Sequence, residues 1–203
     1  MTREAPFVTA LVLAGGRSTR MGTDKAFVQL DGRPMIAHVL DAVRAQSDAV
    51  LVSANEGLER HTALGVDVVT DAHAAGAGPL AGIAAGLRRA RQGCVLVVPC
   101  DAPRLPADLA RRLGEARDAG DADAAVAHDG VRLQPVCLLV HTRVAPVLEN
   151  YLAEGGRRVD AWLATIGTAT VDFADRAANF RNVNDPAELH RLERESHRHA
   201  PAR

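Results

Sequence analysis

The chain is 203 residues long, carries a formal net charge of −1 and is 47% apolar, while aromatic side chains make up only 3% of it. This length and apolar content favour a single domain with a substantial core. The near-neutral charge argues against a surface for nucleic acid or anionic lipid, and so few aromatic residues argue against a platform for stacking bases. No apolar stretch approaches ~18 residues and the N-terminus lacks the apolar core of a signal peptide, so we expect a cytoplasmic protein with no membrane or nucleic-acid partner.

The first half of the chain alternates apolar runs with helical patterns. Strands are expected at residues 8–13, 49–53, 66–70 and 94–98, and helices at 35–45, 57–64 and 79–91. Pro34 fits the first position of the first helix. Apolar strands that alternate with helices predict a mostly parallel sheet covered on both faces, which is a Rossmann-like α/β sandwich of three layers.

The second half is less regular and contains no linker that would divide the chain, so we expect one domain over residues 1–203. Strands are expected at residues 124–127, 135–140 and 168–173, and helices at 106–119, 142–153 and 186–195. Asp185 and Pro186 fit the N-cap and first position of the last helix. Residues 191–203 are polar and are expected to fray.

Three cysteines stand in apolar surroundings and form no C-x-x-C pair. They are Cys94, Cys100 and Cys137. This pattern is typical of small buried side chains in a reducing compartment.

A glycine-rich loop follows the first predicted strand and ends in two cations. Residues 13–25 read LAGGRSTRMGTDK. Glycines let backbone N–H groups approach a phosphate closely, and Arg20 and Lys25 can neutralise its charge. The spacing matches neither the Walker A loop, which places Lys directly after Gly, nor the dinucleotide fingerprint G-x-G-x-x-G. The segment therefore indicates a phosphate-binding loop of another kind.

Polar groups follow each of the first four predicted strands. Gly15 and Gly16 follow the first strand, Asn55 the second, Asp71 the third and Asp101 the fourth. The carboxyl ends of parallel strands meet at one edge of a sheet, where ligands bind. These residues are therefore expected to surround one nucleotide site.

Three of these residues have a second interpretation that the sequence leaves open. Asp101 can ligate Mg²⁺, which prefers one or two carboxylates together with phosphate oxygens and water, or it can cap the next helix. Asp71 and Asn55 can contact the nucleotide, or they can be solvated residues of a turn.

Six segments together resemble the molybdenum cofactor guanylyltransferases, the MobA family. The loop at residues 13–25 resembles the nucleotidyltransferase signature L-A-[GA]-G-x-S-x-R-M-G-x-x-K. The other segments run in the family's order and extend the resemblance over nearly the whole chain: residues 78–83, 99–103, 134–136, 157–163 and 182–186.

The resemblance implies a nucleotidyltransferase that transfers GMP from GTP to molybdenum-molybdopterin and releases pyrophosphate. Residues of about 7–105 would form the nucleotide-binding half, and about 106–190 the acceptor-binding half. The resemblance places Mg²⁺ on Asp101. It assigns nucleotide contacts to Leu13, Ala14, Gly15, Gly16, Lys25, Asn55, Asp71 and Asp101.

The acceptor side is marked by motif position alone. The candidates there are Gly82, Arg157, Asn182 and Asn184. The two asparagines can equally belong to a turn before the last helix.

The attacking group would be a phosphate that is already anionic, so no general base is needed. The catalytic residues would be those that neutralise charge, namely Arg20, Lys25 and Asp101 with its metal.

Other functions remain open on the same scaffold. Gly15 and Gly16 favour guanine in this comparison, because cytidylyl relatives more often read Leu-Ala-Ala-Gly. The alternatives are a cytidylyltransferase, a sugar-1-phosphate nucleotidyltransferase and a non-catalytic nucleotide-binding module. A scaffold that delivers the cofactor to molybdoenzymes, with their maturation proteins as partners, can coexist with catalysis.

Overall fold

The computed structural model of the chain describes residues 6–15, 24–71 and 78–199, the last four of these by their backbone only. Within these residues the strands are β1 (Val8–Leu13), β2 (Gln29–Leu30), β3 (Arg33–Pro34), β4 (Ala49–Ser53), β5 (Asp67–Val69), β6 (Cys94–Pro99), β7 (Ala124–His128), β8 (Leu133–His141) and β9 (Thr168–Asp172).

The α-helices of the described residues are α1 (Met35–Arg44), α2 (Leu58–Thr62), α3 (Pro79–Arg89), α4 (Leu109–Ala119), α5 (Ala145–Ala153), α6 (Val159–Leu163) and α7 (Pro186–His199). Short 3₁₀ helices are η1 (Lys25–Phe27), η2 (Thr142–Val144) and η3 (Ala174–Phe180).

Seven of the described strands form one sheet in the order β5-β4-β1-β6-β8-β7-β9. The strands β5, β4, β1 and β6 run parallel to one another, and β8 runs antiparallel to both of its neighbours. The prediction of a mostly parallel sheet is therefore confirmed. The parallel half carries the four strands whose ends were expected to form the nucleotide site.

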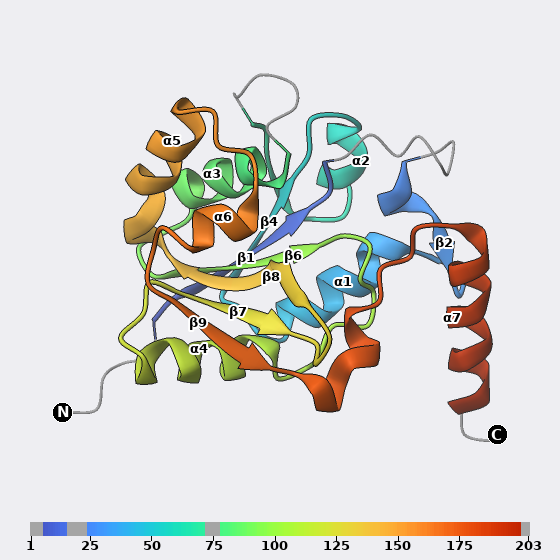
Figure 1. The fold of residues 1–203 in the computed structure, drawn as a ribbon. Coiled ribbons are helices and arrows are strands. Elements are labelled where there is room, and N and C mark those ends of the chain that lie inside the picture. The colour runs from blue at the N-terminus through green and yellow to red at the C-terminus, as the bar shows by residue number, and fades with distance from the viewer. Residues whose placement is uncertain (1–5, 16–23, 72–77, 200–203) are drawn as a thin grey trace.

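Helices cover both faces of this sheet (Figure 1), with α1 and α4 on one face and α3, α5 and α6 on the other. Buried apolar side chains form a separate cluster on each face. Along β1, Ala10 and Val12 belong to the cluster of the α1 face, whereas Leu11 belongs to the cluster of the α3 face. A strand buried on both faces has no polar alternation, which is why residues 8–13 read as a continuous apolar run.

A small annex stands beside the carboxyl ends of the parallel strands. It consists of the β2–β3 hairpin and α7, which stand side by side at the right of Figure 1. Leu30 and Met35 pack there against Val183 and Leu192. The annex ties the C-terminal part of the chain to the segment that follows the phosphate loop.

Most predicted elements match the structure within a few residues, and the differences have local causes. Pro34 does not stand inside the first helix, because it pairs with Gln29 in the hairpin and forms the N-cap of α1. The helix predicted to start at residue 106 begins at Leu109. The final helix continues past residue 195 to His199, while fraying of residues 191–203 stays a prediction.

Candidate functional site

Four aligned strand ends form the base of the site. Leu13 of β1 pairs with Ser53 of β4 and with Pro99 of β6, and Ser53 pairs in turn with Val69 of β5. The residues that follow these strands therefore leave the sheet at the same level. The expected convergence of polar groups at one edge is confirmed for Ala14, Gly15, Asn55, Asp71 and Asp101. Gly16 and Arg20 lie outside the described residues.

Lys25 and Asp101 form an ion pair at the centre of this edge. Lys25 Nζ lies 2.5 Å from Asp101 Oδ2, and each side chain is 16% exposed. The short helix η1 positions the lysine, because Asp24 at its N-cap accepts a hydrogen bond from the Ala26 N–H. A charge pair with so little exposure is weakly screened by solvent. It therefore presents one cation and one carboxylate where the phosphate loop meets the end of β6.

Asp101 does not cap a helix in this structure. The next α-helix, α4, begins at Leu109 with Asp108 as its N-cap residue. Asp101 Oδ1 is buried and accepts no hydrogen bond from any described residue. Because a buried carboxylate oxygen without a partner is costly, this atom is suited to a ligand that the protein alone does not supply.

The donor set at Asp101 fits a hard cation that also binds phosphate. No group of three His, Cys, Asp or Glu side chains suited to a metal occurs among the described residues. A cation at Asp101 would take its remaining ligands from phosphate oxygens and water, as Mg²⁺ commonly does. The residues present are thus compatible with the expected magnesium site.

The C-terminal segment 182–186 reaches the same place from the other end of the chain. Lys25 Nζ also donates to Asn184 Oδ1 at 2.8 Å, and the Val183 N–H donates to the Asp101 carbonyl at 2.8 Å. Asp185 Oδ1 accepts from the Glu188 N–H, which confirms Asp185 as the cap of α7. The structure therefore joins Asn184 to the charge pair. Asn184 also takes part in the turn, since its N–H donates to Glu188 Oε2 and its Nδ2 donates to the Asn182 carbonyl at 3.5 Å. A role of Asn182 toward the acceptor stays a prediction.

Asn55 and Asp71 contact each other. Asn55 Nδ2 donates to Asp71 Oδ2 at 2.7 Å, and the Asp71 N–H donates to Asn55 Oδ1 at 3.1 Å. These two residues follow β4 and β5; Asn55 is exposed and Asp71 is half-buried. They present carboxylate and amide atoms at the same edge of the sheet as Gly15 and Asp101.

Two residues expected on the acceptor side have clear structural partners. A Cβ atom on Gly82 would lie 2.6 Å from Ser53 Oγ and 3.1 Å from Leu13 Cδ2, so glycine lets α3 pack closely on the ends of β1 and β4. The Arg157 guanidinium donates to the carbonyls of Leu152 and Gly156, within its own loop between α5 and α6. A role of either residue toward the acceptor stays a prediction.

An aromatic cluster supports η1 and was not expected from the sequence. The rings of Phe27 and His61 are 4.9 Å apart, and the Arg60 guanidinium lies 3.7 Å from the centre of the Phe27 ring. Burial lowers the pKa of His61, so its imidazole is neutral at neutral pH. These contacts attach α2 to the helix that carries Lys25. The three partners come from two separate segments, and no local pattern joins them.

The cysteines are structural in the way that the sequence predicts. All three are free and buried. Burial raises the pKa of Cys100 and of Cys137 to about 12, and it also raises the pKa of Cys94. A thiol that stays protonated at neutral pH is a poor nucleophile, so none of them suits catalysis.

Comparisons with known proteins show the family of the chain. The MobA-like NTP transferase domain family matches residues 10–168. The chain belongs to this family. A molybdenum cofactor guanylyltransferase of Cupriavidus metallidurans is 44% identical over 93% of this chain and 95% of its own length. One of Shewanella sediminis is 39% identical over 91% of this chain and 95% of its own length. These relatives confirm the family resemblance stated from the sequence, and the protein is a nucleotidyltransferase.

Solved structures of low identity confirm the nucleotidyltransferase fold. Molybdopterin-guanine dinucleotide biosynthesis protein A of Archaeoglobus fulgidus has a TM-score of 0.78 at 22% identity, over 94% of this chain and 99% of that one. The 2-C-methyl-D-erythritol 4-phosphate cytidylyltransferase of Thermus thermophilus has a TM-score of 0.69 at 21% identity, over 92% and 98%. No helix of the described residues is long and apolar enough to cross a membrane.

Proposed function

We propose that this protein transfers GMP from GTP to molybdenum-molybdopterin, which yields the guanine dinucleotide form of the cofactor and pyrophosphate. The observation that carries the proposal is the Lys25–Asp101 pair at the aligned ends of the parallel strands, with Asn184 bound to the same lysine. The names of the relatives at 39% and 44% identity support the choice of nucleotide and acceptor. We place the reaction in the cytoplasm, with no membrane or nucleic-acid partner.

The nucleotide would lie across the ends of β1, β4, β5 and β6. Its phosphates would face the backbone N–H groups of the glycine-rich loop, and Asn55 and Asp71 would contact its nucleoside part. The proposed nucleotide contacts are Leu13, Ala14, Gly15, Gly16, Lys25, Asn55, Asp71 and Asp101. Residues of about 7–105 would thus form most of the nucleotide site, and about 106–190 most of the acceptor site. The proposed acceptor contacts are Arg157, Asn182 and Asn184 of the second half together with Gly82 of the first.

The chemical problem is to bring two anions together. Lys25 and Arg20 would neutralise charge on the α-phosphoryl group as it is transferred and on the departing pyrophosphate. Asp101 would hold Mg²⁺, which when bound neutralises phosphate charge. Asn184 would keep Lys25 at the reacting group by its hydrogen bond to Nζ. The acceptor phosphate is already an anion, so alignment and charge neutralisation suffice without a general base.

Thermal stabilisation by nucleotides tests this proposal. GTP, CTP, UTP and ATP are each added with Mg²⁺ to the purified protein, and the midpoint of unfolding is measured. A ligand at ~100 times its dissociation constant stabilises the folded state by about 2.7 kcal/mol. We expect the largest shift with GTP. A larger shift with CTP or UTP would favour a cytidylyl or uridylyl enzyme, and no shift with any nucleotide would refute a nucleotide site.

A further inference from the structure

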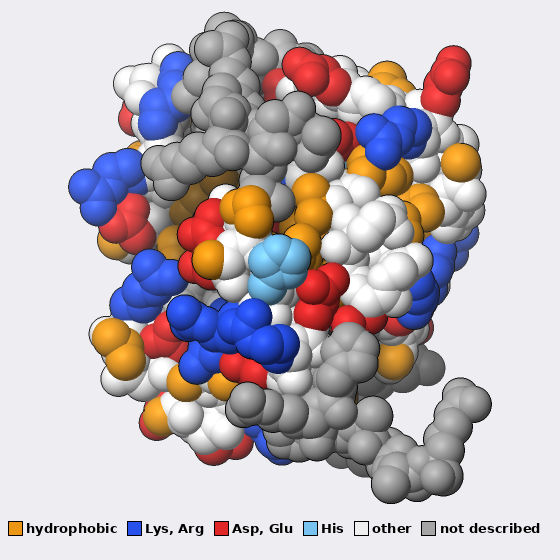
Figure 2. Space-filling model, turned by 90° about the vertical axis from the view of Figure 1, so that its right-hand side faces the viewer, with side chains coloured by type: hydrophobic (Ala, Val, Ile, Leu, Met, Phe, Trp, Pro, Cys, Tyr) orange, Lys and Arg blue, Asp and Glu red, His pale blue; other side chains and the backbone are white. Residues whose placement is uncertain are grey.

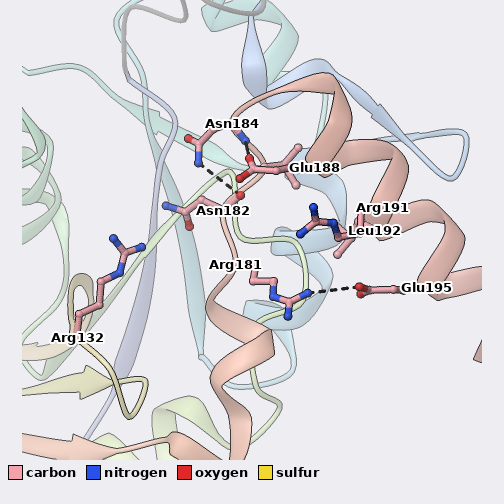
Figure 3. Close-up of a pocket in the computed structure, with 9 residues that line it drawn as sticks. Arg132, Arg181, Asn182, Asn184, Glu188, Arg191, Leu192 and Glu195 are labelled. Carbon is pink, nitrogen blue, oxygen red and sulfur yellow. Dashed lines mark hydrogen bonds and ion pairs between the residues drawn. The ribbon is translucent and has the colours of Figure 1, made fainter.

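A cavity of about 190 Å³ opens beside the charge pair, between α7 and the β7–β8 hairpin. Figure 3 shows Arg132 reaching toward it from the hairpin, while Arg191 extends from α7 on the other side. Asn182 and Asn184 lie between these two arginines along its lining. Since Asn184 is bound to Lys25, the cavity borders the proposed reaction site.

The lining carries more positive than negative charge. Three arginines line the cavity against two glutamates. Both glutamates already accept hydrogen bonds from the protein: Glu188 from the Asn184 N–H at 2.5 Å, and Glu195 from Arg181 at 3.3 Å. Glu195 also binds Arg104 at 2.9 Å. The acidic side chains are therefore held by groups other than Arg132 and Arg191.

Arg132 and Arg191 differ from the third arginine of the lining. In the part of the chain that the structure describes, neither guanidinium forms an ion pair, whereas Arg181 pairs with Glu195. Figure 2 looks onto this side of the molecule and shows Lys and Arg side chains gathered there beside a few acidic ones. The charge of Arg132 also acts on the nearby Asp129 carboxylate, whose pKa it helps to lower, but the two form no ion pair. Two guanidinium groups that face a shared cavity and form no ion pair are suited to an anion, which they can bind through paired N–H donors.

The size of the cavity limits what can bind there. Pockets that enclose a whole small molecule usually measure ~300 Å³ or more, so this one would receive only one end of such a ligand. Asn184, which lines the cavity, is bound to Lys25, so this part of the lining lies where the acceptor would meet the nucleotide. A ligand that enters it would thus be the acceptor, with part of its body against the arginines.

We propose that the cavity is an acceptor subsite in which Arg132 and Arg191 bind an anionic group of the molybdopterin substrate. This inference rests on the proposed function. The anionic group is either the terminal phosphate or the oxygen-bearing metal end of the acceptor, and both chemistries suit a guanidinium. The two arginines add an electrostatic contribution to acceptor binding from outside the Asn-Val-Asn segment at residues 182–184.

Acceptor binding without nucleotide tests the inference. The probes are molybdenum-molybdopterin, metal-free molybdopterin and inorganic phosphate, each titrated against wild type, Arg132→Gln and Arg191→Gln while thermal stabilisation is followed. The control is Arg194→Gln, because Arg194 is an exposed arginine of the same helix that does not line the cavity. Loss of one charge-assisted hydrogen bond should weaken binding ~10-fold. We expect this loss in both cavity variants and not in the control.

The outcomes separate the subsite from the proposed reaction. A loss for the metal-loaded form alone assigns the arginines to the metal end, and an equal loss for both pterins assigns them to the phosphate. Unchanged affinity in both variants, or a wild type that binds no probe, overturns the subsite. GMP transfer is measured in parallel, with a higher acceptor KM and an unchanged GTP KM expected for the cavity variants. A wild type that binds the acceptor at the arginines but transfers no GMP refutes the proposed function and leaves the subsite standing.

Discussion

The Lys25–Asp101 pair can be tested by replacing Lys25 with methionine. Met keeps most of the length of the side chain but removes the charge, which leaves Asp101 without its cation. Asp101 Oδ1 is already buried without a partner among the described residues, and Oδ2 would lose its 2.5 Å contact. Breaking a hydrogen bond to a charged group costs ~1.5–3 kcal/mol, and we expect a loss of about 2 kcal/mol because each side chain keeps some exposure.

This loss is large enough to measure by urea denaturation and by thermal unfolding. For a chain of this length, 1 kcal/mol corresponds to roughly 2–4 °C, so Lys25→Met should lower the unfolding midpoint by roughly 4–8 °C. The double variant Lys25→Met/Asp101→Asn removes the stranded carboxylate charge as well. It should regain about 1 kcal/mol relative to Lys25→Met, because removing both members of a pair costs less than removing one.

The same variants test catalysis. Lys25→Met should reduce the rate of GMP transfer ~100- to 1000-fold, as the loss of one charge-stabilising contact usually does. Asp101→Asn should reduce it by a similar factor. The reasoning is refuted if Lys25→Met is as stable as wild type, or if either folded variant transfers GMP at the wild-type rate.

Three further predictions concern packing and protonation. Gly82→Ala should destabilise the fold by about 1–3 kcal/mol, because its Cβ atom would lie 2.6 Å from Ser53 Oγ. Adding Ser53→Ala should restore part of that loss. Urea titrations of the two variants check this, and an unchanged stability of Gly82→Ala would contradict it. Burial lowers the pKa of His61, so as the pH falls the unfolded chain binds a proton there before the folded chain does. The free energy of unfolding should therefore fall as the pH drops below about 6.5. His61→Phe should show a shallower fall between pH 7.5 and 5.5. A thiol reagent at pH 8 should label none of the cysteines in the folded protein and all of them in urea, because burial keeps the thiols protonated and shielded. Rapid labelling of the folded protein would contradict the buried positions of Cys94, Cys100 and Cys137.

The positions of strands could be anticipated from the sequence wherever strands are buried on both faces. The apolar runs at Val8–Leu13 and Ala49–Ser53 have the boundaries that the sequence predicts, because their side chains pack on two helix layers at once. The β2–β3 hairpin was missed, although Asp31 and Gly32 at its turn both have positive φ and the Asp-Gly pair is a strong hairpin signal. Its strands are only two residues long, which is too short for an alternating pattern.

The site was predictable in part for a related reason. The ends of parallel strands must meet at one edge, so Asn55, Asp71 and Asp101 could be placed together from their order alone. The contact between Lys25 and Asn184 spans 159 residues, and only the family resemblance pointed to that asparagine. Arg132 and Arg191 carry no motif of their own, because their juxtaposition depends on how the hairpin and α7 fold beside the sheet.

Transfer of a labelled α-phosphate tests the central claim of a guanylyl transfer at this site most directly. GTP or CTP labelled at the α-phosphate is incubated with Mg²⁺, molybdenum-molybdopterin and the purified protein. The labelled dinucleotide and the unlabelled pyrophosphate are then both measured. We predict a guanine dinucleotide product formed in equal amount with pyrophosphate, no product without Mg²⁺, and little product from CTP. A preference for CTP, or bound GTP that yields no pyrophosphate over many hours, would contradict the account.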